Sequence, residues 1–130
     1  MHYIKICEGE GEYMLFICYP KCTTCQKAKK WLDDHAISYE LRDIKIENPT
    51  AEELSQWHLK SGLPIKRFWN TSGLQYKALG LKELLPTMDE EEQLKLLSTD
   101  GMLVKRPILI DEDFVLIGFK EVEWENNLGK

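Results

Sequence analysis

The spacing of hydrophobic and polar positions divides the first third of the chain into three elements. An apolar run from Met14 to Tyr19, ended by Pro20, is typical of a strand that is buried on both faces. From Thr23 to about His35, apolar residues recur at helical intervals among lysines and aspartates, which predicts an amphipathic helix. The partly alternating segment from Ile37 to about Ile44 predicts a second strand. Together these elements form a βαβ unit, so the two strands should be parallel.

After this unit, the spacing of hydrophobic positions changes to one typical of helices. The sequence "NPTAEEL" predicts a helix start, with Asn48 or Thr50 as the cap and Pro49 or Ala51 in the first turn. The segments that follow predict several short helices, separated by glycines and prolines. We therefore predict a helical insertion over about 49–102.

The last part of the chain returns to β-rich sequence. Pro107 to Ile110 and Phe114 to Ile117 are joined by an acidic turn of hairpin length. The segment "KEVEWENNL" predicts a short closing helix. The fold class is therefore α/β, with the helical insertion between the βαβ unit and a C-terminal β-hairpin.

Residues 1–13 stand apart from this pattern. The acidic, turn-like "EGEGE" separates "HYIKI" from the first predicted strand. Two interpretations remain open: an N-terminal extension, or an added edge strand in a hairpin with the strand that follows. The domain itself is predicted over 14–130.

Composition narrows the function. A chain of 130 residues, 43% hydrophobic and 30% charged, is typical of one globular domain. Its net charge of -5 argues against direct binding to nucleic acid or anionic membranes. No apolar run approaches the roughly 18 to 20 residues of a membrane span, and the first residues lack the apolar core of a signal peptide. We expect a cytoplasmic protein, in which four cysteines do not imply a disulfide framework.

Cys22 and Cys25 are the strongest candidates for chemistry. Cys22 falls at the predicted junction of strand and helix, where free N–H groups and the helix dipole favour an anion by about 0.3 to 2 kcal/mol. That energy lowers a thiol pKa by up to about 1.5 units. Cys25 lies one helical turn further on, so the two sulfurs share a face of the helix. We predict that Cys22 is the attacking thiolate and Cys25 the more buried, resolving thiol.

Two alternatives compete with a redox pair. A structural zinc site needs four ligands, and only Cys7, Cys18 and three scattered histidines remain to complete one. The pair could also be inert, buried small residues. A C-x-x-C within a βαβ unit favours the redox interpretation, and no metal site is predicted.

Four segments carry a family resemblance: "YPKCTTCQKAKKWL", "NPTAEEL", "NTSGLQYKALGLKELL" and "DGMLVKRPILID". In this order they resemble the arsenate reductase (ArsC)/Spx family of thioredoxin-like proteins, from Met14 to about Leu128. The resemblance implies a four-stranded mixed sheet flanked by helices, with a cis-proline at Pro107 facing the Cys22 thiol. The chain is most similar to the branch that retains a C-x-x-C pair.

The resemblance also implies an activity, that of an arsenate-reductase-like thiol-disulfide oxidoreductase. Arsenate reductases of the family hold the oxyanion with several arginines, because guanidinium forks match its oxygens in charge and geometry. Here Arg106 matches the arginine before the cis-proline, but a second expected arginine falls at Asn70, with Arg67 displaced by about one helical turn. The predicted catalytic residues are Cys22, Cys25 and Arg106. The predicted substrate-binding residues are Lys21, Thr23, Thr24, Arg67 and Pro107.

The expected partners follow from this chemistry. The substrate would be a thiol or disulfide, including one on a protein. No bound cofactor is expected, and an external thiol reductant (thioredoxin, glutaredoxin or a low-molecular-weight thiol) would recycle the protein. The alternative that the resemblance implies is an Spx-like redox-sensing transcription regulator that binds the RNA polymerase α subunit.

Overall fold

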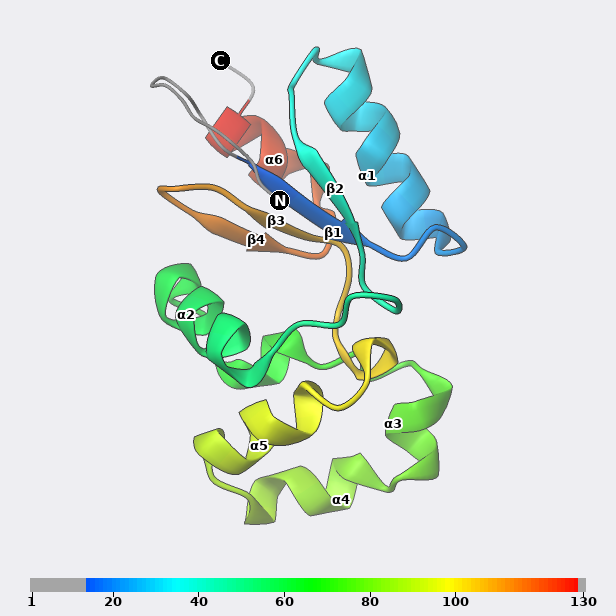
Figure 1. Ribbon diagram of the computed structural model, residues 1–130, viewed down its shortest axis with the longest axis vertical. Helices are drawn as coiled ribbons and strands as arrows, with labels where there is room; N and C mark the ends of the chain where they lie inside the picture. Colours follow the sequence, from blue (N-terminus) through cyan, green and yellow to red (C-terminus); the bar gives the residue numbers. More distant parts are fainter. Residues whose placement is uncertain (1–13, 129–130) are drawn as a thin grey trace.

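The computed structural model describes residues 14–128, so the two interpretations of residues 1–13 fall outside the described part. Its centre is a four-stranded sheet in the order β2-β1-β3-β4 (Figure 1). The strands are β1 (Leu15–Cys18), β2 (Glu40–Asp43), β3 (Ile108–Ile110) and β4 (Val115–Ile117). β1 pairs with β2 in parallel and with β3 antiparallel, and β3 and β4 form the C-terminal hairpin. The predicted mixed sheet is confirmed.

The second strand is shorter than predicted. The sequence predicted a strand from Ile37 to about Ile44, but β2 pairs with β1 only over Glu40–Asp43. The Ile37 N–H donates instead to the carbonyl of Leu32, 3.0 Å away, and belongs to the connection after the helix. At the other end, pairing stops because β1 ends at Cys18, before the turn that begins at Tyr19. The length of β2 is therefore set by its partner.

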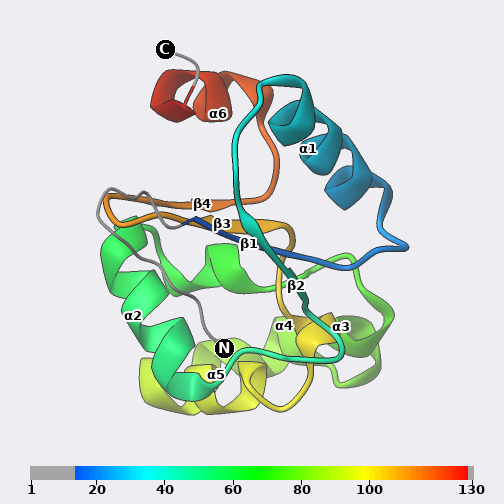
Figure 2. The same ribbon diagram turned by 45° about the horizontal axis from the view of Figure 1, so that its top comes forward.

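Helices cover both faces of the sheet (Figures 1 and 2). One face carries α1 (Thr23–Asp34) and α6 (Glu121–Leu128). The other carries the insertion, whose α-helices are α2 (Ala51–Ser61), α3 (Leu74–Ala78), α4 (Leu81–Leu84) and α5 (Glu90–Leu97). Three short 3₁₀ helices complete the insertion: η1 (Ile65–Phe68), η2 (Leu85–Thr87) and η3 (Gly101–Leu103). This is the predicted thioredoxin-like arrangement with a helical insertion.

Alternation along β1 divides the core in two, because successive strand residues point to opposite faces. Leu15 and Ile17 pack into the core on the insertion side of the sheet. Phe16 and Cys18 pack into the core beneath α1 and α6, which also contains Cys25. All four β1 residues are buried, as predicted. The strand cysteine and the helix cysteine therefore share one core.

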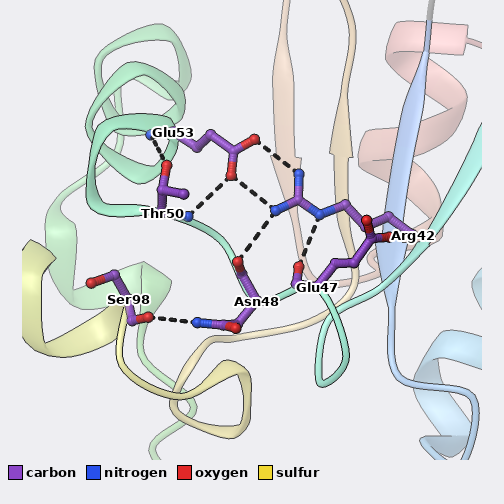
Figure 3. Close-up of polar contacts among 6 residues, drawn as sticks. All are labelled: Arg42, Glu47, Asn48, Thr50, Glu53 and Ser98. Carbon is purple, nitrogen blue, oxygen red and sulfur yellow. Dashed lines mark hydrogen bonds and ion pairs between the residues drawn. The ribbon is translucent and has the colours of Figure 1, made fainter. Parts of the chain in front are cut away.

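Arg42 at the end of β2 connects the sheet to the insertion (Figure 3). Its Nη1 and Nη2 atoms donate to the two carboxylate oxygens of Glu53 in α2, both at 2.9 Å. Its Nε donates to the Glu47 carbonyl at 2.9 Å. The guanidinium also lies 6.0 Å from the ring centre of Trp57. Since the bidentate pair is half-buried, it fixes the direction in which α2 leaves the sheet.

The cap of α2 belongs to the same network. Of the two predicted candidates, Thr50 is the cap: its side chain accepts from the Glu53 N–H, and Glu53 accepts from the Thr50 N–H, both at 3.0 Å. Asn48 has a different task, because its Nδ2 donates to the Ser98 carbonyl beyond α5 at 2.6 Å (Figure 3). The segment before α2 is thus hydrogen-bonded both to the start of the insertion, at Glu53, and to its later part, at Ser98.

Among residues 14–128, no helix combines the length and the apolar character that crossing a membrane requires.

Candidate thiol site

The loop between β1 and α1 presents Cys22. A turn closes where the Cys22 N–H donates to the Tyr19 carbonyl at 2.9 Å. The Gln26 side chain donates back to the Pro20 carbonyl at 3.0 Å and fixes the loop to the helix. Cys22 itself is the N-cap residue of α1, with extended backbone angles (φ -86°, ψ 123°). The thiol is half-buried, so a substrate can still reach it.

Local hydrogen bonding favours the thiolate form of Cys22. Its sulfur makes no full cap hydrogen bond to the first turn of α1. Burial opposes ionisation, but the N–H groups of Cys25 and Thr24, the Cys25 thiol and the charge of Arg106 outweigh burial and lower the pKa of Cys22. The cysteine at the mouth of the site is therefore the more acidic of the pair.

Cys25 has the opposite environment. It is only 1% exposed, and its Sγ accepts a hydrogen bond from the Tyr19 N–H at 3.3 Å. Contact with the Cys18 thiol, followed by burial and the neighbouring Cys22 sulfur, raises the pKa of Cys25 far above its ordinary value. Cys25 is therefore both the more buried and the less acidic thiol of the pair.

The segment before β3 brings a positive charge to the site. The Arg106–Pro107 peptide bond is cis, as expected. The Arg106 guanidinium lies 5.4 Å from the ring centre of Tyr19, and its Nη1 donates to the carbonyls of Met102 and Val104, both at 3.4 Å. Its Nε is buried and has no hydrogen-bond partner among the described residues. Arg106 is therefore held near Cys22 by weak contacts that leave part of its donor capacity open.

The remaining predicted residues are only partly gathered at this site. Lys21, Thr23 and Thr24 lie beside the cysteines and are exposed, while Pro107 is buried. Arg67 lies in η1, and no hydrogen bond or ion pair of its side chain is found within residues 14–128. It does not line the cavity that adjoins Arg106.

The cavity beside Arg106 is lined by Asn70, which occupies the position where the family resemblance implies a second arginine. It has a volume of about 580 Å³, and Asn70, Ser72, Asp100 and Lys45 line it together with Arg106. The Asn70 N–H donates to the Leu103 carbonyl at 2.8 Å, which fixes Asn70 beside the Arg106 segment. An amide therefore occupies this wall, and Arg106 is the one guanidinium among the residues that line the cavity.

Cys18 is the residue that sequence reasoning missed. The sequence predicts no role for it beyond that of a possible zinc ligand, yet hydrogen bonding with Cys25 lowers the pKa of Cys18 and raises that of Cys25. The alternation of β1 contained the signal, since Cys18 follows Phe16 by two residues and so faces α1. The three cysteines of residues 14–128, Cys18, Cys22 and Cys25, are free thiols. Within the described residues, no group of three or more His, Cys, Asp or Glu side chains is arranged to hold a metal ion.

A mixed four-stranded sheet with a C-x-x-C at the start of α1 and a cis-proline before β3 defines a thioredoxin-like protein. Comparison with known proteins narrows this class: the chain belongs to the ArsC family, whose family model matches residues 18–127.

Three relatives illustrate the range of this family. "Uncharacterized protein YusI" of Bacillus subtilis is 50% identical over 88% of this chain and 97% of its own length. The crystal structure of "a possible arsenate reductase" from Streptococcus mutans is 42% identical, covers 91% of this chain and 100% of its own, and has a TM-score of 0.83. "Global transcriptional regulator Spx" of Enterococcus faecalis is 31% identical over 80% of this chain and 77% of its own length. The family thus includes proteins named as enzymes and as regulators.

Proposed function

We propose that this protein is a thiol-disulfide oxidoreductase of the arsenate-reductase-like type. The observation that carries the proposal is the asymmetry of the cysteine pair: Cys22 is accessible with a lowered pKa, and Cys25 is buried with a raised pKa. A nucleophile must be ionised and reachable, whereas a resolving thiol must wait in protonated form until a mixed disulfide is present.

The reaction proceeds in two exchanges. The Cys22 thiolate attacks one sulfur of a substrate disulfide, forms a mixed disulfide with it and releases the other half as a thiolate. Cys25 then gives its proton to that leaving group or to water, attacks the Cys22 sulfur and releases the second substrate thiol. The substrate gains two electrons, and the protein retains a Cys22–Cys25 disulfide. An external dithiol, or two molecules of a low-molecular-weight thiol, reduces this disulfide again.

The remaining predicted residues have supporting roles. Arg106 stabilises the Cys22 thiolate, to which its charge contributes. Lys21, Thr23 and Thr24 are the exposed sequence neighbours of Cys22, and together with Pro107 they are the residues that we assign to substrate contact.

A disulfide suits this site better than arsenate does. The chain contains three arginines, and Arg42 is committed to Glu53. Arg67 does not line the cavity beside Arg106. A single guanidinium cannot provide the several charged forks that hold an oxyanion with one to two negative charges. A disulfide is neutral and needs no such set.

A trapping experiment tests the proposal. In Cys25→Ser, the mixed disulfide on Cys22 cannot be resolved, so the variant should accumulate one covalently bound substrate half that a reducing agent releases. The Cys22→Ser variant is the matched control and should trap nothing. With the unmodified protein and an excess of dithiol, the same disulfide should be turned over repeatedly. A Cys25→Ser protein that remains unmodified would contradict the proposal.

A second candidate function is redox-dependent regulation of transcription. It is favoured by the 31% identity to a protein named global transcriptional regulator and by the C-x-x-C pair itself. In this case the disulfide would change binding to the RNA polymerase α subunit, without turnover. Pull-down with the purified α subunit from reduced and oxidised protein separates the two functions. Redox-dependent capture without disulfide turnover would favour the regulator, and turnover without capture the enzyme.

A further inference from the structure

Three thiols meet at the start of α1, and the pair mechanism uses only two of them. The thiols of Cys18 and Cys22 both raise the pKa of Cys25. Cys18 comes from the last position of β1 and Cys25 from the first turn of α1. Both belong to the core beneath α1, and Cys22 packs against it. The Tyr19 N–H that follows Cys18 donates to the Cys25 sulfur at 3.3 Å, so the strand end and the helix start are held together.

We propose that Cys18 is a third redox-active thiol, which replaces Cys22 as the disulfide partner of Cys25 by intramolecular exchange. The inference rests on the proposed function, because the Cys22–Cys25 disulfide must form first. Cys18 then gives its proton to solvent water and attacks the Cys25 sulfur. The Cys18–Cys25 bond forms, the Cys22–Cys25 bond breaks, and Cys22 leaves as a thiolate. The exchange moves no electrons in or out of the protein and needs no further oxidant.

The positions and acidities of the sulfurs support this step. Once Cys25 is in the disulfide, its thiol no longer donates to Cys18, so the support for Cys18 as the attacking thiol is its place at the end of β1, in the same buried core as the Cys25 sulfur. Cys22 is the better leaving group, because its own pKa is lowered and thiols of low pKa leave faster. The product disulfide would be buried, since Cys18 is 4% and Cys25 1% exposed. Burial would protect it from reductants, while Cys22 is free to react with a second disulfide.

The consequence is a different stoichiometry. With two redox cysteines, the protein reduces one disulfide and then carries no free thiol at its mouth. With three, the released Cys22 attacks a second disulfide and retains one half of it as a mixed disulfide. Glutathione disulfide is a suitable probe, because each retained half adds one glutathionyl group to the intact mass.

The experiment uses the full chain with Cys7→Ser, so that Cys18, Cys22 and Cys25 are its only cysteines. The reduced protein is treated with excess glutathione disulfide, quenched with N-ethylmaleimide at low pH and digested with trypsin. Lys21 lies between Cys18 and the pair, so trypsin separates them. A Cys22–Cys25 disulfide stays inside the peptide 22–27, whereas a Cys18–Cys25 disulfide joins two peptides.

We expect two joined peptides, with glutathione on Cys22. The additional Cys18→Ala substitution should abolish both signals and leave the disulfide within 22–27. A second variant, Cys22→Ser, should form the Cys18–Cys25 disulfide with diamide, which tests the contact independently of Cys22 and of the stability of Cys18→Ala.

The outcomes separate the two proposals. If the disulfide is confined to 22–27 and Cys18 is recovered alkylated, the relay is overturned and the proposed function stands. If Cys22 does not react and no disulfide forms, both fail.

Discussion

Two arginines lie at the same end of the sheet, where β1 and β2 finish and β3 begins, and their surroundings are opposite. Arg42 makes two 2.9 Å bonds to Glu53 and a third to the Glu47 carbonyl. Arg106 has two long contacts of 3.4 Å to carbonyl oxygens and a buried Nε without a partner among the described residues. A guanidinium whose N–H groups are all hydrogen-bonded stabilises a fold, whereas one with unpaired N–H groups can still bind a substrate or stabilise a thiolate.

The neighbourhoods of the two arginines differ in the same way. Hydrogen bonds and tight packing stabilise the join between sheet and insertion, which is formed by Arg42, Asn48, Glu53 and Gly101. The thiol end, around Cys22 and Arg106, is half-exposed and unevenly hydrogen-bonded. Substitutions in the join should therefore reduce stability, and substitutions at the thiol end should change reactivity while stability is nearly unchanged.

The largest effect is expected at Gly101. A Cβ there would collide with the backbone carbonyl of Ile44, in the loop that follows β2. Backbone cannot move aside as a side chain can, so Gly101→Ala should reduce the free energy of unfolding by about 3 kcal/mol. Urea denaturation followed by circular dichroism measures this. Gly62→Ala is the matched control, because a Cβ there meets nothing within 4 Å and only the left-handed φ of 69° opposes it. Equal losses in the two variants would contradict the close approach.

Arg42→Met should cost about 2 kcal/mol. The change leaves the half-buried Glu53 carboxylate and the Glu47 carbonyl without their donor. The control is Lys29→Met, which breaks the exposed pair with Asp33 and should cost under about 0.5 kcal/mol. If the two variants lose similar stability, the Arg42 network is no more than a surface contact.

The contribution of this network should depend on pH. Hydrogen bonding from Arg42 outweighs burial and lowers the pKa of Glu53 below its ordinary 4.5. Because the folded pKa is the lower one, the stabilisation is complete above about pH 5 and is lost as pH falls through the folded pKa. The stability difference of about 1 kcal/mol between the unmodified protein and Glu53→Gln should therefore shrink below pH 4.5. A difference that is constant from pH 7 to pH 3 would exclude this ionic contribution.

The smallest effect is expected at the thiol end. Arg106→Gln removes a positive charge that favours the Cys22 thiolate, so the pKa of Cys22 should rise by about half a unit. Alkylation at pH 7 should slow by about threefold, with little change in unfolding free energy. Arg106→Lys keeps the charge and should restore most of the rate. A large stability loss in Arg106→Gln would mean that this arginine resembles Arg42 in its role.

Much of this molecule could be predicted from local sequence. The C-x-x-C at a strand-to-helix junction placed Cys22 and Cys25, because capping and helical period act within a few residues. Two properties needed the tertiary structure. The Arg42–Glu53 pair joins elements eleven positions apart through a loop, and nothing local distinguishes Arg42 from a binding arginine. The extent of β2 depended on where its partner β1 ends.

Cys18 and Asn70 show the same limit at the candidate site. The alternation of β1 could have predicted that Cys18 faces α1. Its interaction with Cys25, however, depends on how closely the helix packs on the strand. Asn70 lines the cavity next to Arg106 because its backbone pairs with Leu103, more than thirty positions later in the chain. Residue type alone favoured Arg67, which the fold leaves outside that cavity.

The pH dependence of Cys22 alkylation in Cys25→Ser shows directly whether Cys22 is an activated nucleophile. Iodoacetamide reacts with the thiolate, and the tryptic peptide 22–27 reports on Cys22 separately from Cys7 and Cys18. The backbone N–H of residue 25 remains in this variant, and so does the charge of Arg106. The alkylation midpoint should lie clearly below the pKa of about 8.5 of a free cysteine. A midpoint at or above about 8.5 would contradict this expectation, because Cys22 would then be no better a nucleophile than any exposed thiol.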